Sequence, residues 1–600
     1  MESDNDPPSN TSDPIGMPQR PSTPEPPAEP LVNNHPIAVC HTKRNVSPPG
    51  EWWVIRSQVD EDEDEVEGAQ VVSSGSLPDP TSYREAVGSE FSSEWREAML
   101  EEFNWHLENR TWSLVELPVG KKALGSKWVY RTKWNADGSI EQYKARVVVL
   151  GNFQRPGQDF FETFASTLQS ATIRIVLALA AIDDMELRSV DISYAFTNSD
   201  IDVEIYMKQP DGFQQGGKNL VCKLNKSLYG LKQSSPRLWG ETLANVLIGM
   251  GFTKTYSDAS LYIFDQDGIK VIVPVFVDDI TLASKSADKL DYFVTELSKH
   301  FKLRDLGATT YLLGVEITRN RPKRKLYLSQ KQYVINKLDE FGMSDCKPVG
   351  TPMAPGSKLS SDQSPQSADE KAEMENVPYI NAVGSLMYLA TMTRPDIAFT
   401  VGVLARFNSN PGHAHWNAVK HLFRYLKGTI DMKLEYGLND EIGSEMFVTY
   451  CDADHGGNKD NGKSTTGYMV KLGLGVVAWR SKLQPVVTRS TTEAEYIAAG
   501  AAGMEIRWFQ NLLKELGYTP SAPAKLCVDS KSAISVAKNP EHHGRMKHLD
   551  LCFYWLRDQV KMKRMQPIYL NTEDMPADLL TKALPKPKLL KLQREMGLVM

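Results

Sequence analysis

The chain has 600 residues, 41% of them hydrophobic, which is enough for about three or four domains with real cores. No run approaches ~18 uninterrupted apolar residues, so the sequence predicts no membrane span. Residues 1–80 carry a net charge of −11 within a total of −7, so the remainder is mildly basic, which suits contacts with a phosphate backbone. Six scattered cysteines without a CxxC pair exclude a zinc knuckle and favour reduced thiols.

Residues 1–76 are predicted to be a disordered, acidic and proline-rich linker. Residues 1–50 hold 12 of the 35 prolines, and residues 61–67 form an acidic block. Few apolar residues and a run of like charges cannot support a core. The acidic start does not resemble a signal peptide, so we expect a soluble, intracellular chain.

The next segment is predicted to hold a helix followed by strands. Residues 81–118 repeat apolar residues at a near-helical period, and residues 112–134 then alternate as strands. Residues 135–138 predict a turn, followed by a strand at 141–150 that carries Lys144 and Arg146. Basic residues on an edge strand are usually a solvated face. Residues 165–184 predict a helix beneath a sheet.

Three aspartates stand at the ends of predicted strands. Asp191 closes a short strand, and Asp278 and Asp279 follow the apolar run at 271–277 at the tip of a hairpin. Buried carboxylates without a compensating cation cost several kcal/mol each. Three hard oxygen donors suit Mg²⁺, which completes its shell with substrate phosphates. An Asp-rich turn facing water is the alternative for the hairpin alone.

A second set of carboxylates lies towards the C-terminus. The order strand–strand–strand–helix–strand–helix carries Asp452, Glu493, Asp529 and Asp578, and resembles ribonuclease H. Four such acids can hold two metal ions about 4 Å apart and align water for attack on a phosphodiester. Glu493 and Asp578 can alternatively serve only to favour helix N-termini. Asp454 and Glu495 are expected to face solvent.

Four co-linear motifs carry a more specific resemblance: residues 191–198 (DISYAFTN), 204–213 (EIYMKQPDGF), 227–239 (SLYGLKQSSPRLW) and 276–279 (FVDD). They resemble the reverse transcriptase of Ty1/copia-type retrotransposons, in order from about residue 77 to the C-terminus. The resemblance implies an α+β multidomain fold, a right-hand polymerase followed by an α/β ribonuclease H-like domain. Its implied parts are fingers and palm at 77–318, thumb and connection at 319–440, and the ribonuclease H-like domain at 441–600.

The resemblance also implies roles for single residues. Lys144 and Arg146 would meet the incoming triphosphate. Phe196 occupies the position of a steric gate against the 2′-hydroxyl, although a plain core phenylalanine is equally compatible with the spacing. Residues 311–317 are expected to form one strand, the primer grip. The candidate nucleotide and template surface comprises Tyr229, Gly230, Lys232, Gln233 and Arg237, with Gly230 permitting close approach to a base or template.

The expected activity is RNA-directed DNA polymerisation coupled to hydrolysis of RNA in the hybrid. Asp191, Asp278 and Asp279 would bind the polymerase metals, and the four C-terminal acids the nuclease metals: two Mg²⁺ per site, with Mn²⁺ as a substitute. Expected partners are an RNA template, a DNA primer, the RNA/DNA hybrid and dNTPs, with the element's integrase and capsid protein as further candidates and no membrane. The expected location is a cytoplasmic virus-like particle, and also the nucleus. The alternatives are a catalytically decayed copy and a non-catalytic nucleic-acid-binding polyprotein fragment.

Overall fold

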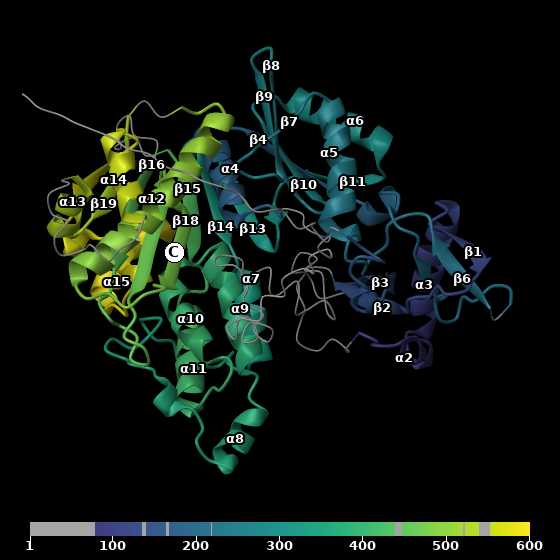
Figure 1. Ribbon diagram of the computed structural model, residues 1–600, viewed down its shortest axis with the longest axis horizontal. Coiled ribbons are helices and arrows are strands. Elements are labelled where there is room, and N and C mark those ends of the chain that lie inside the picture. The colour runs from purple at the N-terminus through teal and green to yellow at the C-terminus, as the bar shows by residue number, and fades with distance from the viewer. Residues whose placement is uncertain are drawn as a thin grey trace, which may run out of the picture. The chain divides into compact units, whose positions relative to one another are not determined.

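The computed structural model describes residues 79–600, except 135–139, 162, 164–166, 218, 439–446, 520–521 and 539–551. The linker expected at 1–76 and the turn expected at 135–138 lie outside the described residues. The described residues belong to one compact unit, Asp64–Met600, that mixes helices and sheets (Figure 1). Within this part of the chain no helix has the length and apolar character needed to cross a membrane.

The first elements form a small core of helices against a hairpin. Helices α2 (Tyr83–Gly88) and α3 (Ser92–Glu108) precede strand β1 (Trp112–Glu116) and the antiparallel pair β2 (Ser126–Trp134) and β3 (Ile140–Val149). In place of the single helix expected over 81–118, the structure therefore has the two helices α2 and α3. The second helix is also shorter than that range. It ends at Glu108 because Arg110 takes a left-handed conformation (φ 51°), which turns the chain into β1.

A three-stranded sheet and a six-stranded sheet follow. In the first, β1 and β5 (Tyr206–Met207) flank β6 (Leu220–Leu224). The second has the order β11-β4-β10-β9-β8-β7 with antiparallel pairing throughout. Its strands are β4 (Glu186–Ile192), β7 (Thr253–Lys254), β8 (Leu261–Gln266), β9 (Ile269–Phe276), β10 (Asp279–Ser284) and β11 (Leu303–Ala308).

The inner strands of the six-stranded sheet are buried on both faces. Val271 and Val273 of β9 belong to one apolar core, whereas Ile272 between them belongs to another, as the two-residue period of a strand requires. Helix α6 (Ala287–His300) and helix α5 (Trp239–Gly249) contribute to the first core, and α4 (Ser170–Ile182) to the second. The sequence is apolar at 165–184 and 271–277 because these segments contribute to the two cores.

The segment after this sheet was expected to begin with a single strand over 311–317. The structure instead has a tight hairpin of β12 (Tyr311–Leu312) and β13 (Val315–Asn320). Leu313 and Gly314 both have positive φ, 49° and 72°, which reverses the chain between the two short strands. Five helices follow: α7 (Lys331–Glu340), α8 (Ala368–Glu375), α9 (Tyr379–Met392), α10 (Ala398–Leu404) and α11 (His413–Gly428).

The hairpin belongs to a five-stranded sheet that the end of the chain completes. Its order is β12-β13-β14-β15-β21, with β14 (Lys325–Ser329) and β15 (Lys433–Gly437) inside it. The edge strand β21 (Leu598–Val599) comes from the extreme C-terminus and pairs with β15. The segments expected as a thumb–connection and as a C-terminal domain are thus joined by backbone hydrogen bonds.

The last sheet has the order β18-β17-β16-β19-β20. Strands β16 (Phe447–Ala453), β17 (Thr465–Leu472) and β18 (Gly475–Leu483) are antiparallel, and β19 (Ala524–Val528) and β20 (Met565–Tyr569) extend the sheet in parallel. Helices α12 (Thr491–Glu515), α13 (Lys531–Lys538) and α14 (Cys552–Lys561) accompany them, and the 3₁₀ helix η11 (Pro576–Leu580) and α15 (Lys586–Glu595) follow. The expected strand and helix order at 447–530 is confirmed.

One buried side chain cross-links these parts. Arg174 of α4 donates from Nε to the carbonyl of Val477 in β18 (2.8 Å) and from Nη1 to that of Thr391 in α9 (2.6 Å). Its guanidinium also lies 3.9 Å from the ring centroid of Trp479. Three segments far apart in sequence therefore share one guanidinium.

The described cysteines Cys222, Cys346, Cys451 and Cys527 are free, as their scattered positions predicted.

Candidate active sites

The first site lies where β4 and the β9–β10 hairpin meet. Asp279 is the register partner of Asp191 across the β10–β4 pair, and Asp278 precedes it at the hairpin tip. The amide of Ile192 donates to the carbonyl of Asp278 at 3.1 Å. All three aspartates are half-buried. The backbone therefore places Asp191 and Asp279 opposite each other in the sheet, with Asp278 in the adjoining turn.

A hydrogen bond from Trp239 holds the tip of the β9–β10 hairpin. Val277 has a positive φ of 54°, an unusual value for a β-branched residue, and its carbonyl accepts a hydrogen bond from Nε1 of buried Trp239 at 2.7 Å. This contact fixes the turn that presents Asp278. Strain of this kind persists only where the surroundings impose it, and it is concentrated at functional sites.

Lys144 and Arg146 lie on the same face of β3. Ala145, Val147 and Val149 are buried, while Lys144 and Arg146 are half-buried, so the basic pair faces away from the apolar core. The guanidinium of Arg146 lies 4.6 Å from the ring centroid of Tyr229. This contact links the strand of the hairpin to the 227–239 motif.

Phe196 is packed inside the protein. Its side chain is 2% exposed, and its ring meets that of Tyr229 edge to face at 4.8 Å. Both rings belong to the apolar core that also contains Phe293. This is the packing that the plain core interpretation expects, and the steric-gate role stays a prediction.

The rest of the 227–239 motif makes contacts within the chain. Gly230 (φ 87°) lies so close to β3 that a Cβ there would be 2.1 Å from the carbonyl oxygen of Val149. The close approach at this glycine is therefore to the protein's own strand, and its contact with a base or template stays a prediction. Gln233 is fully buried and bonds to Gln154 (2.9 Å) and the carbonyl of Asp159 (3.1 Å). Gly230 and Gln233 therefore support the expected nucleotide and template surface through contacts inside the protein.

The two basic residues of the motif are also engaged. The ammonium of Lys232 lies 5.1 Å from the ring centroid of Phe160. Arg237 pairs with Asp202 and lies 3.9 Å from Glu241. For Arg237 to bind a phosphate, the ion pair with Asp202 must first open.

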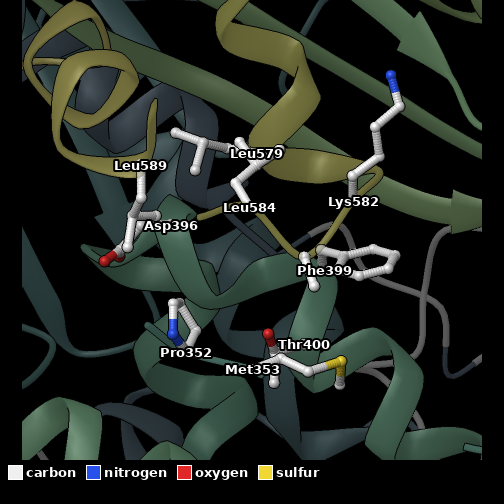
Figure 2. A pocket seen from close by; sticks show the side chains of 10 residues that line it. Pro352, Met353, Asp396, Phe399, Thr400, Leu579, Lys582, Leu584 and Leu589 are labelled. Carbon is white, nitrogen blue, oxygen red and sulfur yellow. The ribbon is translucent and has the colours of Figure 1, made fainter. Parts of the chain in front are cut away.

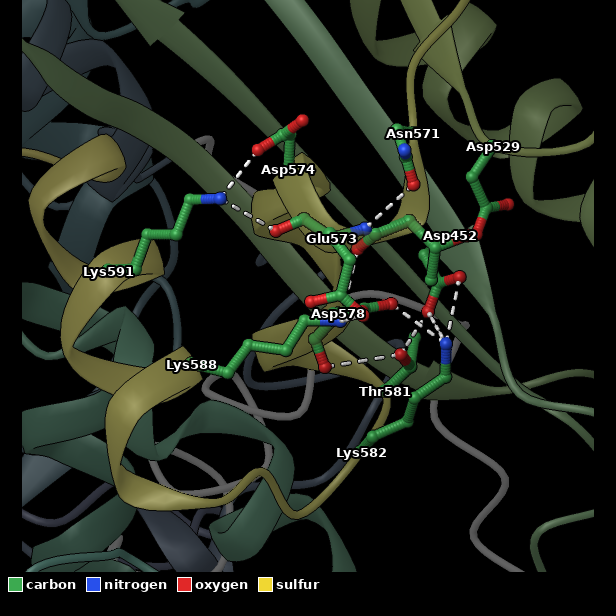
Figure 3. Close-up of polar contacts among 11 residues, drawn as sticks. Asp452, Asp529, Asn571, Glu573, Asp574, Asp578, Thr581, Lys582, Lys588 and Lys591 are labelled. Atoms are coloured by element: carbon green, nitrogen blue, oxygen red, sulfur yellow. Dashed lines mark hydrogen bonds and ion pairs between the residues drawn. The ribbon is translucent and has the colours of Figure 1, made fainter.

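The second site is a compact group of carboxylates. In the described ranges, Asp452, Asp529 and Asp578 are the one group of three or more His, Cys, Asp or Glu residues whose ligand atoms lie within 4.8 Å of one another. Asp452 ends the central strand β16, Asp529 follows the parallel neighbour β19, and Asp578 lies in η11. Figure 3 shows the three carboxylates converging from these elements. The sequence prediction for these residues agrees with this geometry.

A further carboxylate, Glu495, lies beside this group, two residues beyond the predicted Glu493. Oε1 of Glu495 accepts a hydrogen bond from the amide of Ala453 at 3.3 Å, directly beside Asp452. Burial raises the pKa of Glu495, and the charges of Asp452 and Asp529 raise it further. The side chain is 7% exposed, so the expectation that it faces solvent is wrong. Asp454, expected to face solvent too, is half-buried and accepts from the amide of Thr465.

Glu493 has a different setting at the start of α12. Its amide donates to Ser490, the N-cap residue, and its carboxylate accepts from the amide of Arg489 at 2.8 Å. These are the contacts of a residue that stabilises a helix N-terminus, the alternative that the sequence left open. The structure does not include Glu493 in the converging group.

A glycine lets η11 approach the sheet. Gly467 of β17 is the register partner of Asp452, and a Cβ on it would lie 2.7 Å from Cγ2 of Thr581 and 2.8 Å from Cβ of Leu580. Thr581 in turn donates from its hydroxyl to Oδ2 of Asp452. The missing side chain at 467 therefore allows Asp578 and Thr581 to reach Asp452.

The donor set of the second site fits a divalent cation. Asp452 and Asp578 are almost completely buried, and Oε2 of Glu495 is buried without a hydrogen-bond partner. Burial raises the pKa of Asp452, the charge of Lys582 lowers it, and the net change is upwards. Clustered carboxylate oxygens are the ligands that Mg²⁺ or Mn²⁺ prefers.

A small cavity near this group is not a substrate pocket. It measures about 10 Å³ and lies between α10 and the segment after η11, lined by residues such as Phe399, Thr400 and Leu579 (Figure 2). That volume holds about one water molecule. Figure 2 shows the stem of Lys582 at the cavity and its ammonium pointing away from it.

The comparisons with known proteins agree with the motifs. A family model described as "Reverse transcriptase (RNA-dependent DNA polymerase)" matches residues 109–355. The chain is 43% identical over 513 residues to the retrovirus-related Pol polyprotein from transposon TNT 1-94 of Nicotiana tabacum. It is 38% identical over 504 residues to that from transposon RE1 of Arabidopsis thaliana. These matches cover 85% and 84% of this chain, and 38% and 33% of the two relatives.

One shorter relative is matched along its whole length. A putative transposon Ty5-1 protein of Saccharomyces cerevisiae is 35% identical over 320 residues, which are 53% of this chain and 100% of that protein. A solved foamy viral protease-reverse transcriptase in complex with double-stranded DNA aligns over 91% of this chain and 84% of that chain, with a TM-score of 0.40 and 11% identity.

The chain thus spans less than two fifths of the length of the two plant Pol polyproteins. Its four co-linear motifs, the matching family model and a yeast transposon relative covered from end to end point to one assignment. The chain belongs to the Ty1/copia-type retrotransposon polyproteins and includes their reverse transcriptase region.

Proposed function

We propose that this chain is an RNA-directed DNA polymerase with a second, separate site that hydrolyses RNA in RNA/DNA hybrids. The observation that supports the polymerase is the register of Asp279 opposite Asp191, with Asp278 at the adjoining turn. The observation that supports the nuclease is the convergence of Asp452, Asp529 and Asp578 within 4.8 Å. The topology of the last sheet, three antiparallel strands extended by two parallel ones, suits a ribonuclease H-like domain.

Asp191, Asp278 and Asp279 would hold the metals of the first site, and Asp452, Glu495, Asp529 and Asp578 those of the second. Bound Mg²⁺ would activate the attacking oxygen and stabilise the leaving oxygen in both sites. The protein's own contribution is to fix the carboxylates on strand ends, where the sheet restrains their separation. The attacking groups are the 3′-hydroxyl of a DNA primer in the first site and water in the second.

Primer extension on a poly-RNA template with Mg²⁺ and dNTPs tests the polymerase, and cleavage of a labelled RNA/DNA hybrid tests the nuclease. We expect the unmodified chain to perform both reactions. Hybrid binding without either reaction would contradict the proposal and favour a non-catalytic binding module. Loss of both reactions and of binding would favour a decayed copy.

A further inference from the structure

A lysine ammonium lies among the carboxylates of the second site. Nζ of Lys582 is 3.2 Å from Oδ2 and 3.3 Å from Oδ1 of Asp452, and 2.8 Å from Oδ1 of Asp578 (Figure 3). Both aspartates are at most 1% exposed, whereas the lysine side chain is 37% exposed. The ammonium therefore enters the group from the solvent side and contacts two of its three converging acids.

A second lysine, Lys588, forms an ion pair with the other carboxylate oxygen of Asp578. Nζ of Lys588, in α15, lies 2.8 Å from Oδ2 of Asp578 and donates to the carbonyl of Thr572 at 3.1 Å. The hydroxyl of Thr572 donates to Oδ2 of Asp529 at 2.9 Å. The C-terminal segment thus supplies the positive charge that balances the acids.

Lys582 and a divalent ion would compete for the same oxygens. Like charges at this separation in a buried site repel strongly, so the acids need a cation to stay together. A cation ligated by Asp452 and Asp578 would stand within a few ångströms of the ammonium and repel it. The long, flexible stem of Lys582 and its partial exposure give the ammonium a route to solvent.

We propose that Lys582 is an internal counter-ion that keeps Asp452 and Asp578 assembled before metal binds and is displaced when metal binds. This proposal rests on the proposed function, because it concerns the same acidic group. Lys582 is a positioning residue in this account. It sets how tightly the site holds metal and how stable the metal-free site is.

The test uses the full chain in which Asp278 and Asp279 have been changed to Asn, so that Mn²⁺ is titrated only at the C-terminal group. Lys582 is then substituted in this background. We expect Lys582→Met to bind Mn²⁺ on the order of tenfold more tightly, because the competing charge is gone. In EDTA, we expect the melting temperature of Lys582→Met to fall by about 2–4 °C, because two buried acids lose their counter-ion. Lys582→Gln, which keeps a donor without charge, serves as the second variant if Lys582→Met does not fold.

Lys591→Met is the matched control. Lys591 lies on the same helix as Lys588 but pairs with exposed Asp574, outside the acidic group. It should change neither Mn²⁺ affinity nor the melting temperature in EDTA. Unchanged or weaker Mn²⁺ binding by the Lys582 variants, with an unchanged melting temperature in EDTA, would overturn the proposal. Hybrid cleavage by the unmodified chain is measured separately, and only its absence counts against the proposed nuclease.

Discussion

At the scale of single residues, the main result is a shift of two positions along one helix. Glu493 and Glu495 are both acids near the N-terminus of α12, but side chains two apart on a helix point to nearly opposite sides. Glu493 contacts the helix start, whereas the charges of Asp452 and Asp529 raise the pKa of Glu495. Which of the two glutamates is proposed for the second site therefore depends on the side of α12 to which each side chain points.

This assignment predicts different effects of two equivalent changes. We expect Glu495→Gln to reduce hybrid cleavage by at least about 100-fold. Losing a metal ligand should reduce activity at least as much as losing a residue that hydrogen-bonds to a ligand. Glu493→Gln keeps an oxygen acceptor for Arg489 and should leave cleavage nearly unchanged, with a stability loss of about 0.5 kcal/mol from the lost helix-terminus charge. Hybrid cleavage rates and urea unfolding of both variants check this. The reverse ranking in cleavage would refute the role of Glu495.

Phe196 tests whether a packed residue also selects the sugar. We expect Phe196→Val to raise ribonucleotide incorporation, because a smaller side chain removes the clash with a 2′-hydroxyl. It should also cost about 2 kcal/mol of stability by leaving a cavity. Phe293→Val, in the same apolar core, should cost similar stability without altering sugar selection. Equal discrimination by Phe196→Val and the unmodified chain, in single-nucleotide incorporation assays, would leave Phe196 as a core residue only.

At the scale of elements, helix α11 contains a buried histidine that makes stability depend on pH. Nδ1 of His415 accepts from the amide of Gly412 (2.9 Å), and Nε2 lies 3.2 Å from the carbonyl of Ser360, which is the pattern of a neutral ring. Burial lowers the pKa of His415, and the Ser360 carbonyl and the charge of Asp460 oppose that shift only partly. The ring also stacks on Phe407.

Because the folded pKa is depressed, the unfolded chain binds more protons below about pH 6.5. The stability due to neutral His415 is therefore complete above that pH and is lost as the pH falls. We expect His415→Gln to flatten the decline of the urea midpoint between about pH 6.5 and 5. Exposed His413→Gln, which removes a histidine from the same helix, is the control. A slope that is identical in the unmodified chain and in His415→Gln would exclude this contribution.

The elements that sequence reasoning placed well are those with a local signal. Asp278, Asp452 and Asp529 are polar residues directly after largely apolar runs, and strand ends are visible in such a pattern. Asp191 closes a shorter run that alternates. Glu495 also had a signal, because it lies three, four and seven residues before buried Ala498, Ala499 and Ala502 on one helical stripe. Its charge concealed that inward position.

Other features depend on contacts that no local pattern records. Gly230 and Gly467 are required by the approach of Val149 and of Thr581, both distant in sequence. The hairpin at 311–317 looked like one strand because its turn uses two residues, only one of them glycine. The sequence predicts Arg237 on the nucleotide and template surface, and its ion pair with Asp202 appears only in the folded chain.

At the scale of the whole molecule, the described unit is held together by buried contacts between its parts. Strand β21 returns to the sheet of β15, and Arg174 bonds to both Val477 and Thr391. Each buried carbonyl left without a donor costs about 1–3 kcal/mol.

We therefore expect Arg174→Met to lower the unfolding free energy by about 3 kcal/mol, because Val477 and Thr391 lose their donor. Arg188→Met removes a half-exposed arginine paired with Asp305 and Asp291, and should cost no more than about 1 kcal/mol. Urea unfolding of the two variants compares them. A cost for Arg174→Met as small as that for Arg188→Met would show that its buried contacts contribute little.

The central claim is that one chain carries two independent acidic sites. The most direct measurement compares primer extension and hybrid cleavage by Asp278→Asn and by Asp529→Asn in the same preparation conditions. We predict that Asp278→Asn abolishes extension and keeps cleavage, and that Asp529→Asn abolishes cleavage and keeps extension. Two separate sites would be contradicted if either folded variant lost both reactions. They would also be contradicted if both variants kept both reactions.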